Sequence, residues 1–183
     1  PYTGTFFGSV MVGGHDTCEA SLTDVSQIVG SVLQDIDTQM VASVVEDEML
    51  FGLENFGVPH DQIEQRVSET LETVGISDLR DREIATLSGG QKQKVAIAAI
   101  LAMRPRVLVL DEPTAALDPA SSTLVFETLR EANRALGITI VVVEQKVALL
   151  SEYCNRVLVL NHGEIALQGE PHEVFAHTDE LRA

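Results

Sequence analysis

A run of apolar residues that ends in two carboxylates and a proline constrains this chain more than any other stretch. The apolar segment Val107–Leu110 runs directly into Asp111, Glu112 and Pro113. A short apolar run with such a stop is typical of a buried strand in a parallel sheet. In open α/β sheets, ligands bind in the crevice beyond the carboxyl ends of the strands. The two acids therefore mark a candidate ligand site in an α/β domain.

A second motif, Leu87–Gln91 (LSGGQ), lies upstream and opens an alanine-rich run that is expected to form a helix from Ser88 to Met103. Ser88 is expected to cap this helix. The two glycines lack a Cβ atom, so an anion could approach the backbone N–H groups at the positive end of the helix dipole. Taken alone, a Ser-Gly-Gly segment is typical of a flexible turn, and an Asp-Glu pair is typical of an ordinary strand end.

Together, the motifs resemble those of the ATP-binding cassette (ABC) ATPases. Leu87–Gln91 matches the family's signature motif, Val107–Glu112 its Walker B strand, and Ala115–Asp118 its D-loop. The resemblance implies the α/β fold of the P-loop NTPases (a RecA-like core) with an inserted all-α helical subdomain. It also implies two cofactors, ATP and Mg²⁺. The residues that would contact the nucleotide are Ser88, Gly89, Gly90, Gln91 and Asp118.

Four residues at strand ends are candidates for the chemistry. Asp111 is placed to hold Mg²⁺ through water, and Glu112 to orient or deprotonate the attacking water, as phosphoryl transfer requires. In the family resemblance, Gln34 is the Q-loop glutamine that contacts the metal and this water. Gln145 stands where most relatives carry a histidine that bonds the γ-phosphate. Its amide can donate a hydrogen bond but carries no charge.

The chain departs from the family in one respect, because it contains no G-x-x-x-x-G-K-S/T segment. All of its lysines lie downstream of the signature glycines, so none can act as the P-loop cation. In the family this loop precedes the strand expected at Gly8–Val12, so we expect Pro1 to be a truncation point; a naturally degenerate ATPase is the alternative. We therefore expect ATP hydrolysis from the intact domain and not from this chain alone, and incomplete burial of the sheet's central face.

The family resemblance divides the chain into three expected parts. Residues 1–35 form the N-terminal part of the catalytic core, 36–103 the helical subdomain that ends in the signature helix, and 104–183 the C-terminal part of the core. Further buried strands are expected at Val29–Leu33 and Ile138–Val143. A helix is expected at Ser121–Leu136, and Asn161–Gly163 is typical of a hairpin turn.

Charge and cysteine usage limit the class of partner. The net charge is −16, which repels phosphate backbones, and no basic stripe is available for nucleic acid. Cys18 and Cys154 lie in no metal-ligand spacing, so both are expected to be free thiols in a reducing compartment. No apolar run approaches the ~18 residues that span a bilayer. We expect a cytoplasmic protein that is peripheral to the cell membrane through a partner.

Residues 35–55 resemble one branch of the family, the ATPases of energy-coupling-factor importers for vitamins, cobalt and nickel. There an Asp-x-x-x-Gln-type segment forms an additional short helix before an acid-rich helix. The resemblance implies coupling of ATP binding and hydrolysis to uptake through a transmembrane subunit. It also implies a head-to-tail dimer with a second ABC ATPase subunit or domain. An exposed apolar patch is expected to contact the membrane partner, unless it packs the subdomain's own core; its residues are Met40, Val41, Met49 and Phe51.

Two other functions remain open. The chain could belong to a non-transport ABC ATPase that acts on nucleic acid or ribosomes, against which its acidic charge argues. It could also be a noncatalytic interaction fragment, which would fit the missing P-loop.

Overall fold

The computed structural model describes residues 7–177, and a three-stranded parallel sheet lies at its centre. The strand order is β3 (Val29–Val32), β4 (Val107–Asp111) and β5 (Thr139–Val143). In the register, Val32 pairs with Leu110, and Asp111 pairs with Val143. Because the strands are parallel, their carboxyl ends meet at one edge, and the loops that follow them start side by side.

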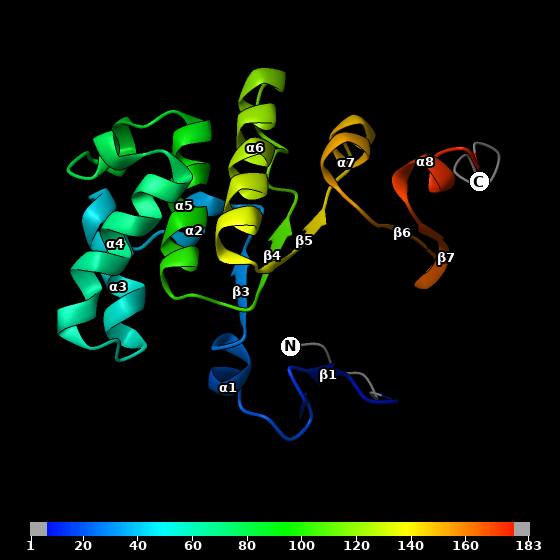
Figure 1. The fold of residues 1–183 in the computed structure, drawn as a ribbon, viewed down its shortest axis with the longest axis horizontal. Coiled ribbons are helices and arrows are strands. Elements are labelled where there is room, and N and C mark those ends of the chain that lie inside the picture. Colours follow the sequence, from blue (N-terminus) through cyan, green and yellow to red (C-terminus); the bar gives the residue numbers. More distant parts are fainter. Residues whose placement is uncertain (1–6, 178–183) are drawn as a thin grey trace.

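Residues 7–177 contain eight α-helices and two 3-10 turns. The helices are α1 (Leu22–Ser26), α2 (Ile36–Gln39), α3 (Val45–Asn55), α4 (His60–Val74), α5 (Gly89–Ala102), α6 (Pro119–Leu136), α7 (Val147–Tyr153) and α8 (Pro171–Val174), and the 3-10 turns are Ser77–Leu79 and Ile84–Thr86. Helices α2 to α5 gather beyond the β3 edge of the sheet, and α7 lies beyond its β5 edge (Figure 1). None of the helices described is long and apolar enough to cross a membrane.

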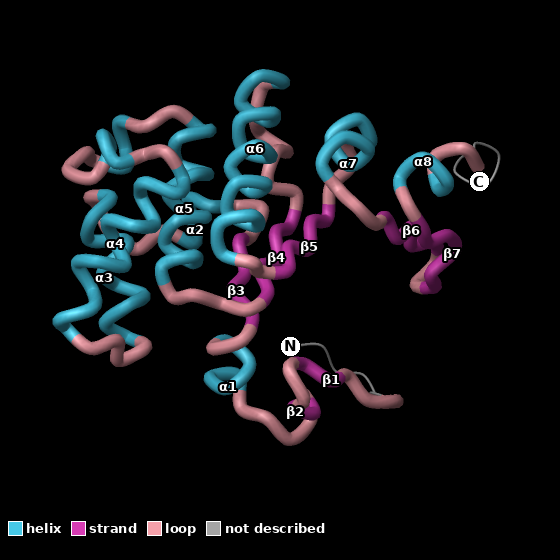
Figure 2. The backbone as a smooth tube through the Cα atoms, viewed as in Figure 1, coloured by secondary structure: helices cyan, strands magenta, loops and turns pink. Residues whose placement is uncertain are grey.

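Two antiparallel hairpins complete the described chain. They are β1 (Met11–Val12) with β2 (His15–Asp16), and β6 (Val157–Asn161) with β7 (Glu164–Gly169). The second hairpin confirms the turn predicted at Asn161–Gly163. Both stand apart from the three-stranded sheet (Figure 2). The first strand is shorter than the predicted Gly8–Val12.

Helix boundaries follow from residues at the ends. Helix α6 begins at Pro119, two residues before the predicted start, because the Asp118 side chain accepts hydrogen bonds from the N–H groups of Ala120 and Ser121. It ends at Leu136, and the Gly137 that follows has a φ of 65°, the left-handed conformation that favours glycine. The predicted helix stop is therefore confirmed.

One buried cluster runs through all three predicted parts of the chain. Val32, Met49, Ile97 and Leu110 are all at most 1% exposed and belong to this cluster. Helix α5 contacts α3, α4, α6 and β3, so it forms the centre of the packing. The division at residues 35 and 103 stays a prediction.

The prediction of a buried strand at Ile138–Val143 is confirmed for the strand itself but is wrong for the burial of one of its faces. Strand β5 alternates, because Ile140 and Val142 pack against the core whereas Val141 and Val143 are 46% and 54% exposed. Only one face of β5 meets a packed layer, and the side chains on the other face are exposed. The expectation of incomplete burial on the sheet is confirmed.

Candidate functional site

Glu112 is held between two amide side chains at the carboxyl edge of the sheet. The Nε2 group of Gln34, which follows β3, donates a hydrogen bond to Glu112 Oε2 at 3.1 Å. The Nε2 group of Gln145, which follows β5, donates to Glu112 Oε1 at 2.6 Å. The structure therefore brings together three of the predicted residues, one from each strand end.

The backbone of Glu112 explains how its side chain reaches both neighbours. Its φ is +43°, a conformation that is uncommon outside glycine and that concentrates at functional sites. Its N–H group donates to the carbonyl oxygen of Val143 at 2.9 Å, which anchors this turned residue to β5. The chain therefore turns directly after Asp111, and the half-buried Glu112 lies across the strand ends.

Asp111 ends β4 at the same edge, and its side chain is exposed. Carboxylate, amide and water oxygens are the ligands that Mg²⁺ prefers, and this ion is usually bound through one or two carboxylates together with substrate phosphates. Within residues 7–177, no group of three or more His, Cys, Asp and Glu side chains could hold a metal. Asp111 offers one carboxylate at this edge and Gln34 one amide oxygen, and their assignment as metal ligands stays a prediction.

The signature motif caps helix α5 through a reciprocal pair of hydrogen bonds. The N–H group of Gln91 donates to Ser88 Oγ at 3.3 Å, and the N–H group of Ser88 donates to Gln91 Oε1 at 2.9 Å. This capping box satisfies two N–H groups at the start of the helix. The predicted cap by Ser88 is therefore confirmed.

The signature glycines also permit close packing, a role that the sequence analysis missed. A Cβ atom on Gly89 would lie 3.1 Å from Leu117 Cδ2, and one on Gly90 would lie 3.3 Å from Ser121 Cβ. Both distances are tighter than ordinary van der Waals contacts. The absence of side chains thus lets the start of α5 lie against the loop before α6 and against α6 itself.

Asp118 serves first as the cap of α6. Its carboxylate accepts hydrogen bonds from the hydroxyl of Ser121 at 2.6 Å and from the N–H groups of Ala120 and Ser121 at 3.0 Å. These bonds, with the Ser121 hydroxyl as the largest cause, lower the pKa of the Asp118 carboxyl. Its contact with nucleotide stays a prediction.

The predicted residues fall into two separate groups. Among residues 7–177, no hydrogen bond joins the segment Ser88–Gln91 to Gln34, Glu112 or Gln145. A cavity of about 230 Å³ adjoins the signature; its lining includes Ser88, Gly90, Gln91 and Ser121. Gln34, Glu112 and Gln145 are not among the residues that line this cavity.

A shallow groove on α3 is lined by part of the predicted apolar patch. It encloses about 360 Å³ and is lined by Val41, Ala42, Asp47, Leu50, Phe51 and Glu54. Val41 and Phe51 are 59% and 51% exposed, as predicted. Met49 is fully buried, so its assignment to the patch is wrong. The inner face of α3 repeats every four residues, and Met49 lies on it between Val45 and Leu53.

The wall of this groove is fixed by a buried carboxylate on α3, that of Glu48. Glu48 is only 8% exposed, and its Oε2 accepts the N–H groups of Val41 at 2.9 Å and Ala42 at 2.8 Å. Each buried hydrogen bond to a charged group contributes about 1.5–3 kcal/mol. The backbone at Val41 is therefore held by α3.

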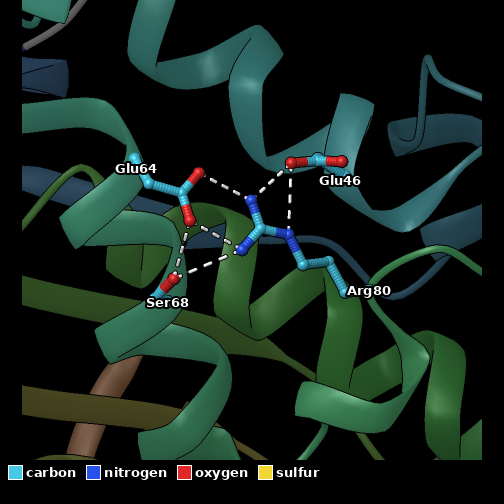
Figure 3. Close-up of polar contacts among 4 residues, drawn as sticks. All are labelled: Glu46, Glu64, Ser68 and Arg80. Carbon is cyan, nitrogen blue, oxygen red and sulfur yellow. Dashed lines mark hydrogen bonds and ion pairs between the residues drawn. The ribbon is translucent and has the colours of Figure 1, made fainter.

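Arg80 joins α3 to α4, as Figure 3 shows. Its guanidinium donates to Glu46 of α3 (Nε to Oε1, 3.1 Å) and to both oxygens of Glu64 of α4 at 2.8 and 2.7 Å. Ser68 accepts a further bond from Arg80 Nη1 at 3.3 Å. The hydrogen bond from Arg80 lowers the pKa of Glu64 to about 2, with a smaller effect from Ser68. This cluster links α3 and α4 to the segment that leads into the signature motif.

Comparison with known proteins identifies the family. The model of the ABC transporter family matches residues 5–115. The energy-coupling factor transporter ATP-binding protein EcfA1 of Symbiobacterium thermophilum is 48% identical over 179 residues, which cover 96% of this chain and 61% of that protein. EcfA1 of Clostridium perfringens is 40% identical over 177 residues, which cover 96% of this chain and 63% of that protein.

A solved structure supports the same assignment. CbiO1 from Clostridium perfringens, described as part of the ABC transporter complex cbiONQ, superposes with a TM-score of 0.80 at 40% identity. The match covers 87% of this chain and 63% of that one, so the chain spans less than two thirds of the length of these relatives. The chain belongs to the ABC transporter family and shares the α/β fold of its P-loop ATPases, with the energy-coupling-factor ATP-binding proteins among its relatives.

Proposed function

We propose that the chain is part of the ATP-hydrolysing subunit of an ABC importer of the energy-coupling-factor type. The observation that carries this proposal is the position of Glu112, whose carboxylate lies between the amides of Gln34 and Gln145. A carboxylate that is oriented by fixed donors at the crevice of a parallel sheet is suited to act as a general base.

Bound ATP with Mg²⁺ supplies the reactive γ-phosphate and a cation that neutralises its charge. Asp111 would hold the metal through water. Gln34 donates through Nε2, which leaves its amide oxygen for the metal. Glu112 would accept the proton of the attacking water, and Gln145 would orient this carboxylate and contact the γ-phosphate.

A head-to-tail dimer with a second ABC ATPase subunit or domain accounts for the separation of the two groups of residues. Ser88, Gly89, Gly90, Gln91 and Asp118 would face the ATP that the second subunit holds. The free N–H groups at the start of α5 suit a phosphate because the helix dipole favours negative charge there. The capping box supports this proposal, since it fixes the direction of those groups.

The groove on α3 is proposed to receive a cytoplasmic helix of a transmembrane subunit. Its exposed apolar side chains, Val41 and Phe51, are bordered by the acids Asp47 and Glu54. This arrangement fits an amphipathic helix with a basic border. The description of CbiO1 as part of a transporter complex supports a partner of this kind. The protein would then act at the cytoplasmic face of the cell membrane. The net charge of −16 argues against a nucleic-acid partner.

The groove can be tested with the intact domain, its P-loop segment restored, co-expressed with its transmembrane subunit. Phe51→Asp should abolish co-purification with that subunit and leave the basal ATPase unchanged. Ile165→Asp is the matched control, because Ile165 is 55% exposed on β7, away from the groove. If the Phe51→Asp variant still co-purifies with the transmembrane subunit, the proposed coupling is contradicted. Equal loss of co-purification in the Ile165→Asp variant would contradict it as well.

A further inference from the structure

We propose that Lys146 is a positioning residue, which holds Gln145 against Glu112 by clamping the end of β5 to the turn at residues 114–117. The inference rests on the proposed function, because it concerns how Gln145 is held within hydrogen-bond distance of the proposed base, Glu112. Lys146 follows Gln145 directly, and the sequence analysis assigned it no role.

The ammonium group of Lys146 uses its full donor capacity on this turn and on the first turn of α6. Nζ donates to the carbonyl oxygens of Thr114 at 2.7 Å and Leu117 at 3.3 Å, and to Ser122 Oγ at 2.8 Å. An ammonium has three N–H groups, so three acceptors satisfy it. Thr114 and Ser122 are 0% and 1% exposed, which makes these rigid anchoring points.

The electrostatics of this contact do not resemble those of an ordinary surface ion pair. Among the described residues, Lys146 lies within salt-bridge distance of no carboxylate. Two of its acceptors, Leu117 and Ser122, flank the start of α6, where the helix dipole disfavours a cation. A cation at this place is explained by the geometry of its acceptors, which converge on one point.

Glu144 forms the second arm of the clamp. Its carboxylate accepts a hydrogen bond from the buried hydroxyl of Thr114. It also accepts the backbone N–H groups of Gln145 at 2.9 Å and Lys146 at 3.2 Å. The backbone of Gln145 is therefore fixed from both sides to the turn that follows Glu112.

This arrangement makes the turn and Gln145 a single unit. A hydrogen bond ties this turn to Glu112, since the N–H group of Ala115 donates to the Glu112 carbonyl oxygen at 3.1 Å. Loss of the Lys146 arm would let the end of β5 move relative to this turn. The 2.6 Å hydrogen bond from Gln145 to Glu112 would then weaken, because its two residues come from separate strands.

The test measures hydrogen exchange of the Gln145 side-chain amide by ¹⁵N NMR on the chain itself. Lys146→Met keeps the apolar stem and removes the donors. Exchange of the Gln145 amide should become about threefold to tenfold faster, which corresponds to the loss of one hydrogen bond of typical net strength. Lys94→Met is the matched control, since Lys94 donates to the carbonyl oxygen of Val74 at 3.4 Å, remote from this edge. It should leave the Gln145 amide unchanged.

A purely structural role would lower the melting temperature of Lys146→Met and leave the Gln145 amide protected in the folded molecules, and this result would overturn the proposal. If Lys146→Met does not fold, Ser122→Ala removes one acceptor and should accelerate exchange in the same direction by a smaller factor. Unchanged exchange in a folded Ser122→Ala would then overturn the proposal. Neither measurement needs ATP or a partner, so their outcome is independent of whether the proposed hydrolysis is found.

Discussion

Gln145 Nε2 lies 2.6 Å from Glu112 Oε1, although the two residues follow different strands and are 33 positions apart. A histidine at position 145 would titrate near neutral pH, whereas an amide donates a hydrogen bond at every pH. The ability of Gln145 to donate a hydrogen bond to Glu112 thus does not change with pH.

The replacement Gln145→His should therefore introduce a pH dependence. In the intact domain, the turnover of the variant should change across a protonation step near the ordinary histidine pKa of ~6.5, because only the imidazolium carries charge. Steady-state ATPase rates from pH 5.5 to 8.5 measure this. Gln65→His, on the exposed face of α4, is the control and should keep the parental profile. An active Gln145→His with an unchanged profile would argue against this contact in catalysis.

Because Glu64 is paired with Arg80, the free energy of unfolding should depend on pH in the acid range. The pKa of Glu64 is about 2 in the folded protein, against an ordinary value of 4.5. The unfolded chain therefore takes up this proton first as the pH falls. The stabilisation is present in full above the ordinary value and is lost progressively between about 4.5 and about 2.

Urea unfolding at a series of pH values checks this dependence. Glu64→Gln should flatten the part of the curve between pH 5 and pH 2.5, and high salt should reduce the difference, since Glu64 is exposed. Glu72→Gln, an exposed acid on the same helix, should leave the slope close to that of the parent. Equal slopes for the parent and Glu64→Gln would show that Arg80 does not lower the pKa of the Glu64 carboxyl.

A charge on the buried side of α3 should lower the free energy of unfolding more than a charge in the exposed loop before α3. Met49→Asp should lower the free energy of unfolding by several kcal/mol, because Met49 is 0% exposed and the new carboxylate would find no partner there. Val41→Asp should change it by about 0.5 kcal/mol or less, since Val41 is 59% exposed. Thermal melts of both variants decide this. Similar losses would mean that the groove wall belongs to the core.

The chain by itself should bind ATP weakly and should not hydrolyse it. Its sequence contains no glycine-rich P-loop with a lysine, and that loop supplies most contacts to the phosphates. Calorimetric titration with Mg²⁺ and ATP should give no saturable binding below the millimolar range. A sub-millimolar dissociation constant would show that the described residues form a phosphate site of their own.

Short-range patterns in the sequence predicted much of the fold and the separate parts of the site. The cap at Ser88, the stop at Gly137 and the strand that ends at Asp111 depend on neighbouring residues, and all three are confirmed. The apolar spacing of α3 also contained the information that Met49 faces inward. Its assignment to the surface patch gave a family resemblance more weight than the helical period.

The remaining features depend on contacts between distant residues. Val141 is exposed because it lies on the face of β5 that does not pack against the core, and no local pattern specifies which face is covered. Likewise, Lys146 contacts the carbonyl oxygen of Thr114, 32 positions away. The charged residues on either side of Gln145, in an otherwise apolar segment, were the available signal, but their hydrogen-bond partners could be found only in the folded chain.

The measurement that tests the central claim most directly is a comparison of ATP binding and turnover for Glu112→Gln in the intact domain. The amide keeps the size of the side chain and cannot accept the proton, so turnover should fall by about 10² or more. The dissociation constant of ATP should stay within about threefold of the parent, because one proton acceptor is lost and no metal ligand is removed. Glu131→Gln, an exposed acid on α6, serves as the control and should retain parental turnover. Parental turnover in Glu112→Gln would contradict its role as the base, and with it the function proposed for this edge of the sheet.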